Sequence, residues 1–120
     1  MAVRKAGQLA IVQFPTVALG EGKPRPVLLI APLPGPYEDW PVSMLSTQLQ
    51  QSVVGFDEVI DLTQSDFQTS GLKVASVIRI ARLAVVPASM LVGAIGEISP
   101  ERLQRIRQKL ADWIANPSPK

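Results

Sequence analysis

The 120-residue sequence contains no cysteine and no histidine. Without cysteine, the chain can form no disulfide, no thiolate nucleophile and no zinc–thiolate site. Without histidine, it lacks the most common general base and the most common metal ligand. Any catalysis by this chain must therefore use arginine, lysine, carboxylates, hydroxyls or the backbone.

Charge is also scarce. Charged residues make up 18% of the chain, and 12 basic against 10 acidic side chains give a net charge of +2. Globular proteins usually carry about a quarter of charged residues. The shortfall suggests that a partner, such as a second copy of the chain, covers part of the surface. A net charge this small does not by itself indicate a nucleic-acid binder.

Long hydrophobic runs are absent near the start of the chain. Residues 1–14 contain two basic residues and then an apolar run of strand length, far below the roughly 20 residues of a membrane span. No small-residue cleavage site follows, so we expect no signal peptide and a cytoplasmic protein. The length favours a single domain over residues 1–120, with its core at about 7–115.

What the sequence does contain is a series of short apolar segments separated by proline- and glycine-rich loops. These segments are rich in aliphatic and β-branched residues and predict strands. The predicted strands span 8–14, 25–31, 42–48, 56–62, 73–86 and 90–98, with a loop at 32–41. Gly93 and Gly96 indicate a bulge or a close backbone approach in the last strand. Residues 63–71 predict a turn or a single helical turn that ends at Gly71.

A helix is predicted at 99–115. Ser99 is suited to the N-cap and Pro100 to the first helical position. One face carries the apolar residues Leu103, Ile106, Leu110, Trp113 and Ile114. The basic residues of this helix, Arg102, Arg105 and Lys109, could contact RNA or DNA, but the sequence favours a solvated face.

Together these elements predict a mainly β (α+β) protein. Five to seven short strands followed by one amphipathic helix favour a small barrel or a curled antiparallel sheet, which the helix covers on one face.

Several stretches of the sequence, taken in their order along the chain, resemble a known protein family. The stretches are "GQLAIVQFP", "KPRPVLLIA", "DWPVSMLSTQ" and "GLKVASVIRIARL", followed by a Gly-Glu-Ile-Ser-Pro-Glu helix start. Over about residues 7–114, this set resembles the PemK/MazF family of toxins from bacterial type II toxin–antitoxin systems. The resemblance implies an SH3-like antiparallel barrel with a C-terminal helix, assembled as a homodimer. It further implies a metal-independent endoribonuclease that cuts single-stranded RNA, typically mRNA, without a cofactor, and an antitoxin that occupies the RNA groove.

The resemblance also assigns candidate catalytic residues. The family's catalytic arginine precedes the proline at the start of the second strand, which is Arg25 here. Its catalytic hydroxyl opens a "[ST]-x-Q" sequence, which assigns Ser46, although threonine is more common there. Another member uses an arginine in the later strand, which corresponds to Arg79. The acidic residue two positions on is replaced by Ala81 in this chain.

Further candidates rest on weaker grounds. Glu21 corresponds to an acidic residue in the first loop of some members, and Thr47 adjoins Ser46 but is expected on the other face of its strand. The candidates for RNA contact are Lys23, Gln48, Tyr37 and Trp40. Tyr37 and Trp40 could stack on bases, or equally pack against the barrel or at a dimer contact. Ser46, Arg79 and Glu21 have structural alternatives as a strand-end hydroxyl, an ion-pair partner and a loop carboxylate.

The chemistry suits these residue types. RNA can be cleaved by its own 2′-hydroxyl, so the protein need only align the backbone and stabilise charge on the phosphorane. The arginine fork makes two parallel hydrogen bonds to phosphate. A guanidinium is a poor base because of its high pKa, which favours electrostatic and acid roles for Arg25. Ser46 would donate a hydrogen bond to phosphate.

A second hypothesis comes from the departures at two positions. Serine at position 46 and alanine at position 81 are compatible with a catalytically degenerate barrel that only binds an antitoxin or RNA. A DNA-binding regulator has little support, because the sequence has no basic cluster.

Overall fold

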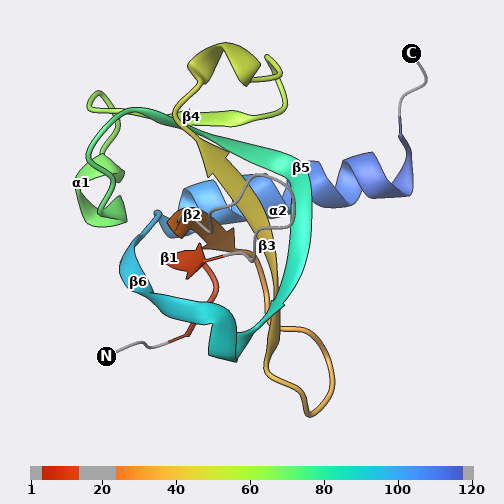
Figure 1. Cartoon of the computed structure of the whole chain (residues 1–120). Coiled ribbons are helices and arrows are strands. Elements are labelled where there is room, and N and C mark those ends of the chain that lie inside the picture. Colours follow the sequence, from red (N-terminus) through yellow and green to blue (C-terminus); the bar gives the residue numbers. More distant parts are fainter. Residues whose placement is uncertain (1–3, 14–23, 118–120) are drawn as a thin grey trace, which may run out of the picture.

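The computed structural model describes residues 4–13 and 24–117. These residues form one six-stranded antiparallel sheet and one long helix (Figure 1). The strands are β1 (Gln8–Gln13), β2 (Pro24–Leu29), β3 (Asp39–Ser46), β4 (Glu58–Ile60), β5 (Ser76–Pro87) and β6 (Leu91–Glu97). The predicted mainly β fold is confirmed.

The strands follow the order β4-β5-β3-β2-β1-β6 across the sheet. The edges β4 and β6 are not paired with each other in the described part of the chain, so the sheet is curled but not closed. Of the two architectures that the sequence left open, the curled antiparallel sheet is the one observed.

Both predicted helical segments form. The single turn α1 (Phe67–Ser70) ends at Gly71, which has the left-handed φ of 79° that glycine adopts readily. The long helix α2 (Pro100–Ala115) begins after Ser99, whose Oγ accepts a hydrogen bond from the backbone N–H of Arg102 at 3.1 Å. Two 3₁₀ turns, η1 (Leu49–Gln51) and η2 (Ala88–Met90), complete the elements.

The core lies on both faces of the sheet because neighbouring residues of a strand point to opposite faces. Helix α2 covers one face through Ile106 (Figure 1). The first cluster of buried apolar residues, which includes Ile106, consists of Leu9, Leu28, Leu45, Ile60, Phe67, Ile78, Ile80, Ile98 and Ile106. The second consists of Ala10, Val12, Val27, Leu29, Trp40, Val42, Val86, Ala88 and Leu91.

The predicted apolar face of the helix is only partly used. Leu103 and Leu110 pack against the first cluster, whereas Ile114 is 59% exposed. Trp113 makes an edge-to-face contact with Phe56, with the ring centroids 6.3 Å apart. The C-terminal end of α2 extends past the sheet (Figure 1), and Ile114 belongs to neither core cluster of the described residues.

The strand boundaries differ most from the prediction at three places. The strand predicted at 56–62 is only three residues long, and the one predicted at 73–86 begins at Ser76. The third strand begins at Asp39, inside the segment 32–41 that we predicted as a loop because of its prolines. In an antiparallel strand, the N–H and the carbonyl of one residue point to the same side. The carbonyl of Pro41 accepts a hydrogen bond from the N–H of Ile30, which lies just past the end of β2. The N–H that proline lacks would point the same way, so β2 loses no ladder bond.

The glycines of β6 have the role expected of them. A Cβ at Gly96 would lie 2.2 Å from the carbonyl oxygen of Thr69, so α1 and β6 approach each other closely there. The pairing of β1 with β6 also shifts register at two places along the strand. Within the described residues, no helix has both the length and the apolarity that a membrane span requires.

Candidate functional site

A cavity of about 520 Å³ lies where β2 begins and β3 ends, beside the first half of β5. It contains five of the candidates that the sequence proposed. Its lining residues are Pro24, Arg25, Pro26, Met44, Leu45, Ser46, Thr47, Gln48, Gln51, Ser76, Arg79 and Arg82. The candidates Arg25, Ser46, Thr47, Gln48 and Arg79 are therefore neighbours in the fold, although they come from three strands and a loop.

Arg25 occupies the second position of β2 and is exposed at the cavity. Pro24 and Pro26 flank it, and both restrict the backbone around it. The strand pairs with β1 at this level, with Arg25 opposite Val12, and becomes fully buried from Val27 onward. The backbone of Arg25 is therefore fixed, while its side chain is free to reach an anion in the cavity.

Ser46 is the last residue of β3 and is half-buried. Its Oγ accepts a hydrogen bond from the backbone N–H of Gln48 at 3.0 Å, so the hydroxyl proton is available for donation. Thr47, which was predicted to face the other side of the strand, is also among the residues that line the cavity. The strand ends at Ser46, and the alternation of side chains does not extend to Thr47.

Arg79 lies at the inner side of the cavity. Its Nη1 donates a hydrogen bond to Gln51 Oε1 at 3.2 Å, and its Nε lies 3.9 Å from Asp57 Oδ2. The side chain of Asp57 is only 3% exposed. The site thus has a carboxylate next to Arg79 even though Ala81 replaces the acidic residue of the family pattern. Asp57 was not predicted as part of the site, because it lies in the loop before β4 and meets Arg79 only through the fold.

A bulge in β5 brings a further arginine to the cavity. Met44 of β3 pairs with Arg79, but the preceding Ser43 pairs with Leu83, so residues 80–82 are extra on the β5 side. In a regular strand, Arg79 and Arg82 would point to opposite faces because three positions separate them. The bulge places both of them in the lining of one cavity.

Two buried side chains satisfy the backbone of this bulge. The N–H of Ile80 donates to Asp57 Oδ1 at 3.1 Å, and the carbonyl of Ile80 accepts from Ser43 Oγ at 2.9 Å. Ser43 is fully buried. The bulge is therefore held on both sides by specific hydrogen bonds, as is typical of bulges beside functional sites.

The remaining candidates lie elsewhere. Tyr37 is 75% exposed in the loop between β2 and β3 and does not line the cavity. Trp40 is only 7% exposed and belongs to the second core cluster, so it packs in the core and offers no face for base stacking. Glu21 and Lys23 fall outside the described residues. Gln51, Ser76 and Arg82 line the cavity but were not singled out from the sequence.

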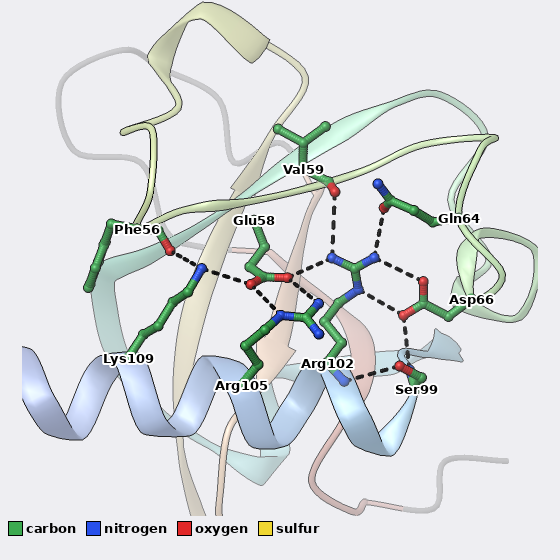
Figure 2. A network of polar contacts seen from close by, with 9 residues as sticks. All are labelled: Phe56, Glu58, Val59, Gln64, Asp66, Ser99, Arg102, Arg105 and Lys109. Atoms are coloured by element: carbon green, nitrogen blue, oxygen red, sulfur yellow. Dashed lines mark hydrogen bonds and ion pairs between the residues drawn. The ribbon is translucent and has the colours of Figure 1, made fainter.

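Three basic residues of α2, Arg102, Arg105 and Lys109, form an ion-pair network (Figure 2). Arg102 is 6% exposed and makes a two-pronged contact with Asp66, with its Nε 2.8 Å and its Nη2 3.1 Å from the two carboxylate oxygens. Its Nη1 lies 2.8 Å from Glu58 Oε1. The expectation of a solvated basic face was wrong for Arg102, which is buried, whereas Arg105 is exposed but ion-paired. They face the sheet side of the helix, where β4 and α1 present carboxylates that periodicity alone does not reveal.

Glu58 is the centre of this network. Besides Arg102, it accepts hydrogen bonds from both Arg105 nitrogens at 2.8 and 2.9 Å and from Lys109 at 2.9 Å (Figure 2). Burial alone would raise the pKa of Glu58, but the hydrogen bonds from Arg105 and Lys109 outweigh it and lower the pKa from 4.5 to about 2. Burial would likewise raise the pKa of Asp66, and the bond from Arg102 brings it below its ordinary value.

The described residues contain no group of three or more acidic side chains arranged to hold a metal ion. The cavity instead gathers three guanidinium groups, from Arg25, Arg79 and Arg82. Such groups are suited to phosphate because their planar forks bind oxygen pairs. The fold and the cavity define a small β protein with a cavity lined by cationic and hydroxyl side chains.

A match between the sequence and a known family identifies the family of this protein. Residues 5–114 match the family described as PemK-like, MazF-like toxins of type II toxin–antitoxin systems. The match spans most of the chain, and the protein belongs to this family. Comparison with curated proteins gives no significant match.

Solved structures share the fold at low sequence identity. The Mycobacterium tuberculosis toxin MazF-mt6 is 18% identical with a TM-score of 0.63, covering 90% of this chain and 96% of that one. An endoribonuclease in complex with its cognate antitoxin, from a mycobacterial species, is 18% identical with a TM-score of 0.64, covering 98% and 100%. MazF from Deinococcus radiodurans is 19% identical with a TM-score of 0.62, covering 96% and 99%.

Proposed function

We propose that this toxin is an endoribonuclease that cleaves single-stranded RNA, in particular mRNA in the cytoplasm, without a metal ion. The observation that carries the proposal is the meeting of Arg25, Ser46 and Arg79 around one cavity. These residues provide phosphate-binding forks and a hydroxyl donor, which are the groups that cleavage by the RNA's own 2′-hydroxyl requires.

In the proposed reaction, the 2′-oxygen forms a bond to phosphorus while the bond to the 5′-oxygen breaks. The 2′-hydroxyl proton passes to solvent, and the leaving 5′-oxygen gains a proton from Arg25 or water. Arg25 and Arg79 bind the non-bridging oxygens as negative charge develops, and Ser46 donates a hydrogen bond to one of them. The products are a 2′,3′-cyclic phosphate and a 5′-hydroxyl.

The proposal includes protein partners. A fold neighbour is an endoribonuclease bound to its cognate antitoxin, which supports an antitoxin for this chain that covers the same cavity. We also propose a homodimer, because large apolar side chains such as Val85 and Val92 are 58% and 69% exposed.

The decisive experiment incubates the purified protein with a mixed-sequence RNA in EDTA and maps the cuts and their end groups. We expect cleavage with 2′,3′-cyclic phosphate (or 3′-phosphate) and 5′-hydroxyl ends. A strand with 2′-deoxyribose on the 5′ side of the cut should bind but remain intact. Cleavage of that strand would exclude the mechanism. If no RNA is cut but an antitoxin peptide binds tightly, the non-catalytic alternative is correct.

A further inference from the structure

Arg82 lies between two adjoining cavities. The second cavity, of about 440 Å³, is lined by Met44, Ala81, Arg82, Leu83 and Ala84, and it shares Met44 and Arg82 with the first. Arg82 is exposed and has no hydrogen bond or ion pair within the described part of the chain. By contrast, Arg102, Arg105 and Lys109 of α2 are each paired with a carboxylate.

We propose that Arg82 binds the RNA phosphate next to the one that is cleaved, and that the second cavity holds the nucleotide flanking the cut. This inference rests on the proposed RNA-cleaving function of the first cavity. Consecutive nucleotides of a strand are joined by phosphates, so a strand crossing from one cavity to the other passes Arg82, the only charged residue among those described that both cavities share.

The structure supports a dedicated position for Arg82. Its place in the cavity depends on the β5 bulge, which disrupts the ladder to β3. Ser43 and Asp57 compensate for the disrupted pairing by bonding both backbone groups of Ile80. Bulges commonly re-aim a side chain at a site. Without the three extra residues, Arg79 and Arg82 would not face the same ligand.

The composition of the second cavity predicts how it reads the nucleotide. Apart from Arg82, the described residues that line it are Met44, Ala81, Leu83 and Ala84, whose side chains carry no strong hydrogen-bonding group for a base edge. It should accept a base by apolar contact without selecting its identity. Sequence preference should therefore be weak at the nucleotide that occupies this cavity.

The test uses binding rather than cleavage. Oligonucleotides with one 2′-deoxyribose at the mapped cleavage position are uncleavable, and they are made as a dinucleotide and with one to three extra nucleotides on either side. Their affinity for wild-type, Arg82→Gln, Arg82→Lys and Lys5→Gln proteins is measured by fluorescence anisotropy at several salt concentrations. Lys5 is a matched control because it pairs with Glu97 on the surface and does not line either cavity.

We expect Arg82→Gln to bind the extended strands more weakly and to reduce the slope of log K against log salt by about 0.7, the value for one phosphate contact on a single strand. Arg82→Lys should restore most of the slope, and Lys5→Gln should match the wild type. The dinucleotide should bind all four proteins similarly. The inference is overturned if Arg82→Gln binds the extended strands as tightly as the wild type does, or if it loses the same affinity for the dinucleotide. It is also overturned if Arg82→Gln has an altered oligomeric state. Absence of cleavage by the wild type is a different result, which would refute the proposed function itself.

Discussion

Asp57 and Ile80 are joined by a hydrogen bond of 3.1 Å from the backbone N–H of Ile80 to Asp57 Oδ1. The other carboxylate oxygen accepts a bond from the N–H of Val53 at 2.9 Å. One buried side chain thus connects the loop that carries Gln51 with the bulge between Arg79 and Arg82. The shape of the cavity depends on a residue that is not part of its lining.

We expect Asp57→Ala to destabilise the fold by about 1–3 kcal/mol, because it leaves two backbone N–H groups without their partner. RNA cleavage should fall further than the fraction of folded protein does, since Arg79 and Gln51 lose their support. Denaturant unfolding and cleavage assays measure the two effects. Asp61→Ala is the control, because Asp61 caps a turn through Thr63 away from the cavity. Wild-type cleavage by folded Asp57→Ala would contradict this role.

Substitutions at the two main catalytic candidates should separate charge from hydrogen bonding. Arg25→Ala should abolish cleavage and leave stability unchanged, because the side chain is exposed and outside the core. Ser46→Ala should lose roughly 10²-fold in rate, the usual cost of one transition-state donor, whereas Ser46→Thr should preserve or raise the rate. Single-turnover cleavage rates measure these effects. The assignment fails if Arg25→Ala cleaves RNA at the wild-type rate.

Stability should fall in acid because of Glu58. Its pKa is lowered from 4.5 to about 2 in the fold, so the deprotonated form is favoured by folding. The resulting stabilisation, on the order of 3 kcal/mol, is present above about pH 4.5 and is lost as the pH falls toward 2. Glu58→Gln should lower stability at pH 7 and flatten this pH dependence, whereas Glu97→Gln, on the surface, should do neither. Urea unfolding from pH 7 to pH 2 tests both statements. A wild-type pH dependence in Glu58→Gln would assign the effect to other groups.

Two glycines of β6 provide a matched pair. At Gly96, an added Cβ would meet the carbonyl oxygens of Thr69 and Ser70 at 2.2 and 2.5 Å, while at Gly93 nothing lies within 4 Å. Gly96→Ala should therefore separate α1 from β6 and lower the melting temperature strongly, and Gly93→Ala should have little effect. Thermal unfolding followed by circular dichroism compares the two variants. Equal melting temperatures would show that α1 moves without cost.

The proposed homodimer can be measured directly. Sedimentation at micromolar concentration should give about twice the chain mass of 13.0 kDa, since apolar surface of this kind is usually covered in an obligate interface. The value should not depend on salt if apolar contacts dominate. A monomer at concentrations well above micromolar would refute the dimer.

Local sequence signals were enough to predict the helix and most strands. The start of α2 follows from Ser99 and Pro100, and the end of α1 follows from Gly71, because these residues act on the backbone within a few positions of themselves. The convergence of Arg25, Ser46 and Arg79 on one cavity came instead from the family resemblance, since periodicity says nothing about which strand ends meet.

Features that depend on tertiary contacts were not predictable. The partners of Arg102 lie 36 and 44 residues away along the chain, so a basic helix residue looked like a solvated one. The β5 bulge has no glycine or proline to mark it, and it depends on Ser43 of β3 and on Asp57 in the loop before β4. Trp40 lies in a proline-rich stretch that resembled a loop, yet it is buried in the core.

Asp57 and Glu58 are neighbours in the chain, yet they bond to different parts of the structure. Asp57 bonds to the β5 bulge, and Glu58 bonds to three cations of α2. Because β4 is only three residues long and forms an edge of the sheet, these contacts supply much of what holds it. Release of α2 would therefore free β4 and, with it, the loop that shapes the cavity. We therefore expect helix α2 and the loop before β4 to open as one cooperative unit.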